Sequence, residues 1–240
     1  EGERDLRRAG LQRGRTGQRR RAFGGVAALA VVGVLALLAA VAPRRWPGWV
    51  LARRGQWLVA GLLLLEVVGW HVFYALRGPF SPATGLPLHL CDVNQLLLAL
   101  YLLWPRPRLF DVAYHWVVTS SALALLFPDL PADFPAPVYF SLFSSHGLSL
   151  ALWCYLVYGR GRRPGPRSAG HAVAALAGWA AVVAPINAWV GGNYLYLREL
   201  PAVPFPLLAW LPPAPYYWPI AAFLFYLAFR GLRHLAPSRP

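Results

Sequence analysis

Apolar residues fill seven stretches of the chain, and polar residues gather in the segments between them. Each stretch approaches the length of about 20 residues that a helix needs to cross a bilayer. The stretches are residues 23–42, 57–76, 87–104, 110–127, 138–158, 169–190 and 214–232. Because the connections are short, neighbouring helices should pack antiparallel. The pattern predicts an all-α, polytopic transmembrane helix bundle with about seven spans, or six if the first does not cross.

The composition supports a single membrane domain. Hydrophobic residues make up 58% of the chain and charged residues only 13%, about half the usual charged share of a soluble domain. We expect one transmembrane helical domain over residues 23–235. Residues 1–22 are polar and rich in Gly and Arg, which predicts a disordered N-terminal extension, and residues 236–240 form a short tail.

The basic residues, all arginine, give the chain a net charge of +14 and indicate how it is oriented. They concentrate in the loops at 43–56, 105–109 and 159–168 and at the C-terminal end, whereas the alternate loops hold only Arg77 and Arg198. The positive-inside rule makes the first set cytoplasmic in a multi-pass protein of the cell membrane. The same distribution argues against nucleic-acid binding. It also puts the arginine-rich N-terminal tail outside if all seven spans cross.

The remaining polar groups gather toward the opposite, extracytoplasmic side. The run at 88–95 opens the third span, and its first turns should lie near the outer surface with His89, Cys91 and Asp92. His146 should lie about 12 Å deep in the fifth span at 1.5 Å per residue. Ionisable groups inside a membrane indicate a functional site by default. We therefore expect the site in the outer half of the bundle.

Cys91 is the candidate nucleophile within that run. A helix N-terminus favours a thiolate, and His146 can take the proton from another helix. The alternative is a small buried hydrophobe, which is what most free cysteines are. His89 and Asp92 would support the site, or Asp92 would simply cap the helix. Glu66, in the middle of the second span, is either a structural hydrogen-bond partner or a functional group.

Further polar residues are expected on the same side. Asn94 belongs to the run, and Asp129 lies in the loop before the fifth span. Asn187 ends the sixth span, and Asn193 and Tyr194 follow it. Asn187 and Asn193 are candidates to stabilise an oxyanion, and Tyr194 is a candidate to line an opening for lipid.

Several fragments together resemble the YwaF-type integral membrane family of bacteria, over about residues 23–235. They are Leu88-His89-Leu90-Cys91-Asp92, Phe127-Pro128-Asp129-Leu130, Phe134-Pro135, Ser145-His146-Gly147, Asn187, Gly192-Asn193-Tyr194-Leu195-Tyr196-Leu197 and Tyr216-Tyr217. That family is similar to an animal cysteine-dependent phospholipid acyltransferase. The resemblance implies that Cys91 accepts the acyl group and that His146 is its partner.

Three functions remain in competition. The first is an acyltransferase that acts on membrane phospholipids through a thioester on Cys91, without a metal or cofactor. The second is a metal-binding membrane hydrolase or carrier that uses the mixed ligands His89, Cys91, Asp92 and His146, although no tight metal-ligand spacing favours it. The third is a transporter-like bundle without chemistry, in which Glu66 and Asp92 relay protons.

Overall fold

The computed structural model describes residues 25–46, 52–128, 130, 132, 134–201 and 206–236. Within them every regular element is helical: Gly25–Arg45, α2 Arg53–Arg77, α3 Leu90–Leu103, α4 Pro107–Leu126, α5 Pro137–Cys154, η2 Tyr155–Gly159, α6 Ser168–Val190, η3 Tyr194–Tyr196, η4 Pro206–Trp210, α7 Tyr217–Leu232 and η5 Arg233–Leu235. The all-α bundle is confirmed, with one helix for each predicted span. The N-terminal tail, the last four residues and Asp129 lie outside the described residues.

Local sequence explains where several helices begin and end. Proline is the first residue of α4 and of α5, a position where its missing amide costs nothing. Gly191 ends α6 in the left-handed conformation with φ of 70°, and its amide bonds to the Asn187 carbonyl. Five helices are long and apolar enough to cross a membrane, whereas α3 has only 14 residues.

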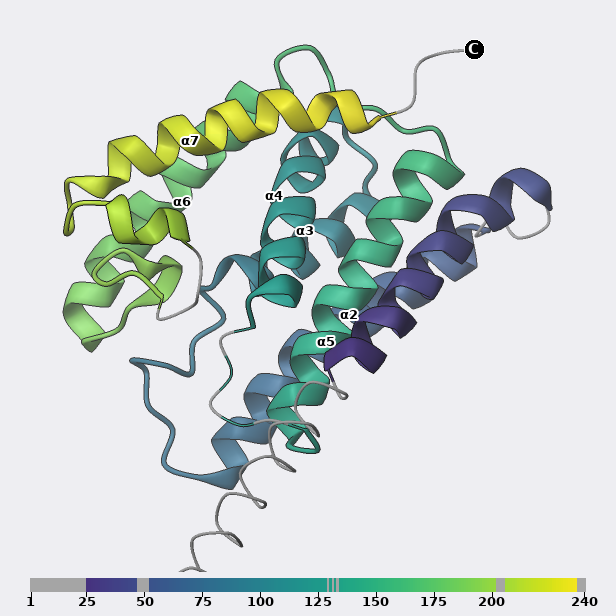
Figure 1. Ribbon diagram of the computed structural model, residues 1–240. Coiled ribbons are helices and arrows are strands. Elements are labelled where there is room, and N and C mark those ends of the chain that lie inside the picture. Colours follow the sequence, from purple (N-terminus) through teal and green to yellow (C-terminus); the bar gives the residue numbers. More distant parts are fainter. Residues whose placement is uncertain are drawn as a thin grey trace, which may run out of the picture.

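The helix α4 lies at the centre of the bundle. It packs against α3, α5 and α6, while α2 packs against α3 and α5, and α7 packs against α6. Figure 1 shows α6 and α7 on one side and α2, α5 and the purple helix Gly25–Arg45 on the other. The core at this centre contains Tyr114, whose phenol donates to the Leu232 carbonyl.

The bundle has two chemically different ends. At the arginine-rich end, the Arg53 guanidinium donates to the carbonyls of Leu102 and Leu103, at 3.1 and 2.7 Å, where α3 ends. At the arginine-poor end, the Trp218 indole at the start of α7 donates to the carbonyl of Leu197, at 3.0 Å. The segregation of arginine from the other polar groups along the chain stays a prediction.

The first helix, Gly25–Arg45, runs parallel to α5. A Cβ added at Gly147 would lie 2.7 Å from Cγ2 of Val32, and one added at Gly159 would lie 2.7 Å from the Ala39 carbonyl oxygen. Along this contact, the residue numbers increase in the same direction in both segments. The helix therefore begins at the arginine-poor end, where we expect the N-terminal tail to emerge.

Candidate functional site

The helix that carries Cys91 begins inside the bundle rather than at its surface. The Trp179 indole, about half way along α6, donates to the Leu88 carbonyl at 3.2 Å just before α3 begins. The expected position near the outer surface is therefore corrected, because the chain after α2 descends into the protein before it turns helical. Non-helical chain at membrane depth is tolerated only where protein or a cavity surrounds it.

Tyr194 holds this descending segment in place. Its phenol accepts a hydrogen bond from the Leu86 amide at 2.8 Å and donates one to the Pro82 carbonyl at 2.7 Å. The side chain is fully buried, and burial raises the pKa of the phenol, so it acts as a neutral donor. His89 packs its ring against those of Tyr194 and Tyr196, with centroids 5.1 and 5.7 Å apart.

Cys91 lies in the first turn of α3 and is half-buried. The charges of Asp92 and Glu66 reach its Sγ. The Asp92 carboxylate reaches back to the amide of His89, the residue that precedes the helix. This is the geometry of half a capping box. The structure therefore supports the capping interpretation of Asp92, which also interacts with the charge of His71.

A layer of polar side chains lies one turn further along α3. The Gln95 amide donates to Oε2 of Glu66 on α2 at 2.6 Å, and the Ser144 hydroxyl on α5 donates to Oε1 of Glu66 at 3.1 Å. The amide of Asn94 donates to the carbonyl of Trp116 and to the hydroxyl of Ser120 on α4. Glu66 thus connects three helices.

His146 belongs to this layer. It is buried on α5, and its Nδ1 lies 3.4 Å from the hydroxyl of Ser121 on α4. The neighbouring Ser120 binds Asn94, and Ser144, two residues before His146, binds Glu66. No hydrogen bond joins His146 to Cys91 in the structure as described. His146 and Cys91 lie on α5 and α3, two helices that pack against each other.

Two acceptors in the layer lack a partner. Oδ1 of Asn94 and Oε1 of Gln95 are buried and accept no hydrogen bond in the described part of the chain. Buried polar atoms are nearly always paired, and exceptions occur where a water or ligand belongs. The two oxygens can receive a donor such as a water or a lipid hydroxyl.

The two asparagines near the end of α6 organise their own loop. Asn187 pairs with both the amide and the carbonyl of Tyr194, at 2.8 and 2.9 Å. Oδ1 of Asn193 accepts from the amides of Arg198 and Glu199, and its Nδ2 donates to the Glu199 carbonyl. These bonds tie the loop to α6, so that Tyr194 can hold the segment before α3.

Sequence reasoning missed most of the supporting layer. Ser120, Ser121 and Ser144 are polar residues inside apolar spans, which is the one signal that could have identified them. The contact of Trp179 with the segment before α3 could not be recognised from the sequence, because tryptophan is common in membrane proteins as an interface residue. Among the described residues, no three His, Cys, Asp or Glu side chains gather as a metal would require.

A comparison with protein families identifies one match. The model of the TMEM164 family, a multi-pass membrane family, matches residues 18–232, which is most of the chain. No curated protein and no solved structure matches the chain. The YwaF-type resemblance and the likeness to an acyltransferase remain expectations.

Proposed function

The chain belongs to the TMEM164 family of multi-pass membrane proteins, and on that premise we propose that it is a cysteine-dependent acyltransferase of membrane phospholipids. The observation that carries the proposal is the start of α3 inside the bundle, with Cys91 in the first turn of the helix. A helix N-terminus stabilises negative charge, both on an attacking thiolate and on an oxyanion beside it. A buried imidazole, that of His146, lies on the neighbouring helix α5.

The first half-reaction transfers an acyl group from a phospholipid to the enzyme. The Cys91 thiol gives its proton to His146, and the thiolate attacks the carbonyl carbon of the lipid ester. The carbon–oxygen bond of the ester breaks, and the lysophospholipid oxygen leaves with the proton from His146. The product is an acyl thioester on Cys91.

The second half-reaction returns the acyl group to an acceptor. The hydroxyl of a lysophospholipid gives its proton to His146 and attacks the thioester carbonyl. The carbon–sulfur bond breaks, and Cys91 leaves as a thiolate that the proton from His146 restores to the thiol. The unpaired oxygens of Asn94 and Gln95 are suited to accept hydrogen bonds from an incoming hydroxyl.

The surroundings of the site fit lipid substrates that enter from the bilayer. Leu88, just before Cys91, lies about half way along α6, so the site lies near the middle of the bundle. The positive-inside rule assigns the arginine-poor end to the extracytoplasmic side of the cell membrane. The side chains of His71 and Glu66 lie near Asp92, the residue that follows Cys91. Asp92 serves there as the cap of α3, and Glu66 keeps α2, α3 and α5 together.

The test is to trap the acyl-enzyme. Purified protein in lipid nanodiscs is incubated with a phospholipid whose acyl chain is isotopically labelled, and peptides are analysed by mass spectrometry. We expect a hydroxylamine-sensitive acyl adduct on Cys91 that Cys91→Ser removes. Cys154→Ser is the matched control, because Cys154 is the other cysteine and lies on α5 toward the arginine-rich end. Normal lipid remodelling by Cys91→Ala would disprove the proposal.

A further inference from the structure

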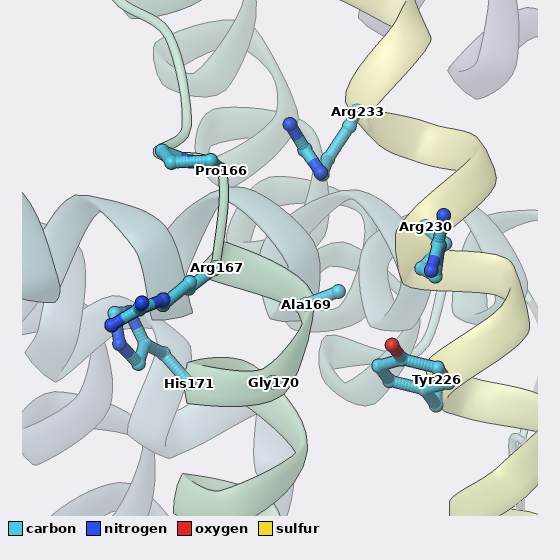
Figure 2. A pocket seen from close by; sticks show the side chains of 8 residues that line it. All are labelled: Pro166, Arg167, Ala169, Gly170, His171, Tyr226, Arg230 and Arg233. Atoms are coloured by element: carbon cyan, nitrogen blue, oxygen red, sulfur yellow. The ribbon is translucent and has the colours of Figure 1, made fainter.

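At the end of the bundle opposite the arginine-poor loops, a pocket of about 490 Å³ opens between the start of α6 and the end of α7. Its volume falls in the range of about 300–1,000 Å³ that is usual for ligand sites. Figure 2 shows Arg167 and His171 on the α6 wall, and Arg230, Arg233 and Tyr226 on the wall formed by α7 and η5. The residues come from segments about 60 positions apart in the sequence, so the fold creates the pocket.

The three arginines of the pocket have no protein counterion. None of Arg167, Arg230 and Arg233 forms a salt bridge or a hydrogen bond within the part of the chain that the structure describes. Asp111 is the one acidic residue in the segments that form the arginine-rich end. Its carboxylate is already engaged, with Oδ1 accepting from the Gly165 amide at 2.7 Å and Oδ2 from Nδ1 of His171 at 2.9 Å.

The pocket also offers neutral donors. The first amides of a helix have no intrahelical partner, and two residues of the first turn of α6, Ala169 and Gly170, line the pocket. Gly170 has no side-chain carbons that would cover its amide, and no atom lies within 4 Å of where its Cβ would be. Since Asp111 accepts from Nδ1 of His171, Nε2 is the ring atom left to face a ligand. Tyr226 adds a phenol.

The start of α6 is held firmly enough to keep this geometry. The ring of His115 on α4 is fully buried, and its Nε2 lies 3.0 Å from the hydroxyl of Ser168, the first residue of α6. The same ring stacks on Phe229 of α7, with centroids 4.9 Å apart. One histidine therefore fixes both walls of the pocket relative to α4.

We propose that this pocket binds a phosphate group, through the guanidinium groups of Arg230 and Arg233 and the free amides of α6, with Arg167 adding positive charge at the α6 wall. Guanidinium groups match phosphate oxygens in bidentate geometry, and a helix N-terminus adds amides that point at the anion. The phosphate is either the headgroup of a phospholipid in the leaflet at the arginine-rich end or part of a soluble compound. The site is separate from Cys91, because Trp179, which marks the start of α3, lies eight residues or about 12 Å beyond His171 along α6.

The experiment uses the full chain and two probes. Inorganic phosphate is titrated against protein in neutral detergent, with the shift in thermal unfolding as readout. Phosphatidic acid is titrated into phosphatidylcholine nanodiscs, with bound lipid counted by native mass spectrometry. We expect at least one probe to bind, and each of Arg230→Gln and Arg233→Gln to weaken it about tenfold, as the loss of one charge-assisted bond does. Binding should also weaken as the concentration of sodium chloride rises.

A matched control separates the pocket from the general positive charge. Arg54→Gln removes the same charge from the same end of the bundle, but Arg54 lies on α2 outside the pocket. It should leave binding unchanged. Binding of both probes assigns the site to phosphate in general, and binding of phosphatidic acid alone assigns it to a lipid headgroup. The proposal is overturned if neither probe binds, or if Arg54→Gln weakens binding as much as the two pocket variants do.

Discussion

The two ends of the bundle handle polar groups in opposite ways. Around α3, the side chains of Glu66, Gln95 and Asn94 bond to one another or to neighbouring helices, and two oxygens remain unpaired in the interior. Around the start of α6, the three pocket arginines form no salt bridge with any of the described residues. The first arrangement is suited to holding reacting groups at fixed positions, and the second to attracting an anion from outside.

The difference follows from where each group of side chains lies in the membrane. Charge inside a bilayer must be paired or hydrogen-bonded, so the layer around Glu66 is closed by bonds between helices. At the membrane surface, arginine side chains remain hydrated. Arginines that set the orientation of the protein in the membrane therefore need no protein counterion.

The largest expected effect contrasts two histidines at the two ends. His146→Gln removes the proton acceptor of the proposed reaction, so acyl transfer should fall by about 100- to 10,000-fold, the usual contribution of general acid–base catalysis. The measurement is the initial rate of labelled acyl transfer between phospholipids in nanodiscs. His115→Gln disturbs an equally buried ring at the arginine-rich end, and should lower the unfolding temperature while the transfer rate stays near that of the unchanged protein. Equal losses of rate in the two variants would contradict the assignment.

The next effect concerns stability. Glu66→Leu leaves the amide of Gln95 and the hydroxyl of Ser144 without their acceptor, which should cost about 1–3 kcal/mol. Glu66→Gln keeps an acceptor oxygen and should lose less. At the other end, Arg230→Leu breaks no bond and should change stability by less than about 0.5 kcal/mol when no anion is present. Thermal and denaturant unfolding in detergent measure all three. A stable Glu66→Leu protein would show that the layer adds little to folding.

Much of the fold could be predicted from the sequence, because span length and hydropathy act locally. The segment 107–126 is apolar, begins with a proline and is followed by another at Pro128, and those properties alone place α4. The depth at which α3 begins could not be predicted in this way. It depends on bonds from Tyr194 and Trp179, which lie about 90 to 110 residues away in the sequence.

In the candidate site, too, features set by local sequence could be predicted, and features set by helix packing could not. The position of Cys91 near the start of a helix was predicted, although the span was expected to begin at residue 87 and α3 begins at Leu90. The partners of Glu66 were not, because they depend on how α2, α3 and α5 rotate about their axes when they pack. The arginines of the pocket were read as signals of orientation, since a sequence shows charge but not whether a counterion lies nearby.

The last effect we predict concerns how the first helix fits against the side of α5 next to His146. Gly147→Ala would place a Cβ 2.7 Å from Cγ2 of Val32, and relief of that overlap should cost about 1–3 kcal/mol. Gly178→Ala in α6 meets no atom within 4 Å and should instead stabilise the protein by about 0.5–1 kcal/mol through helix propensity. Val32→Ala added to Gly147→Ala should restore most of the lost unfolding temperature, because it removes the methyl groups that clash. If the double variant is no more stable than Gly147→Ala, the first helix does not pack on α5 through these two residues.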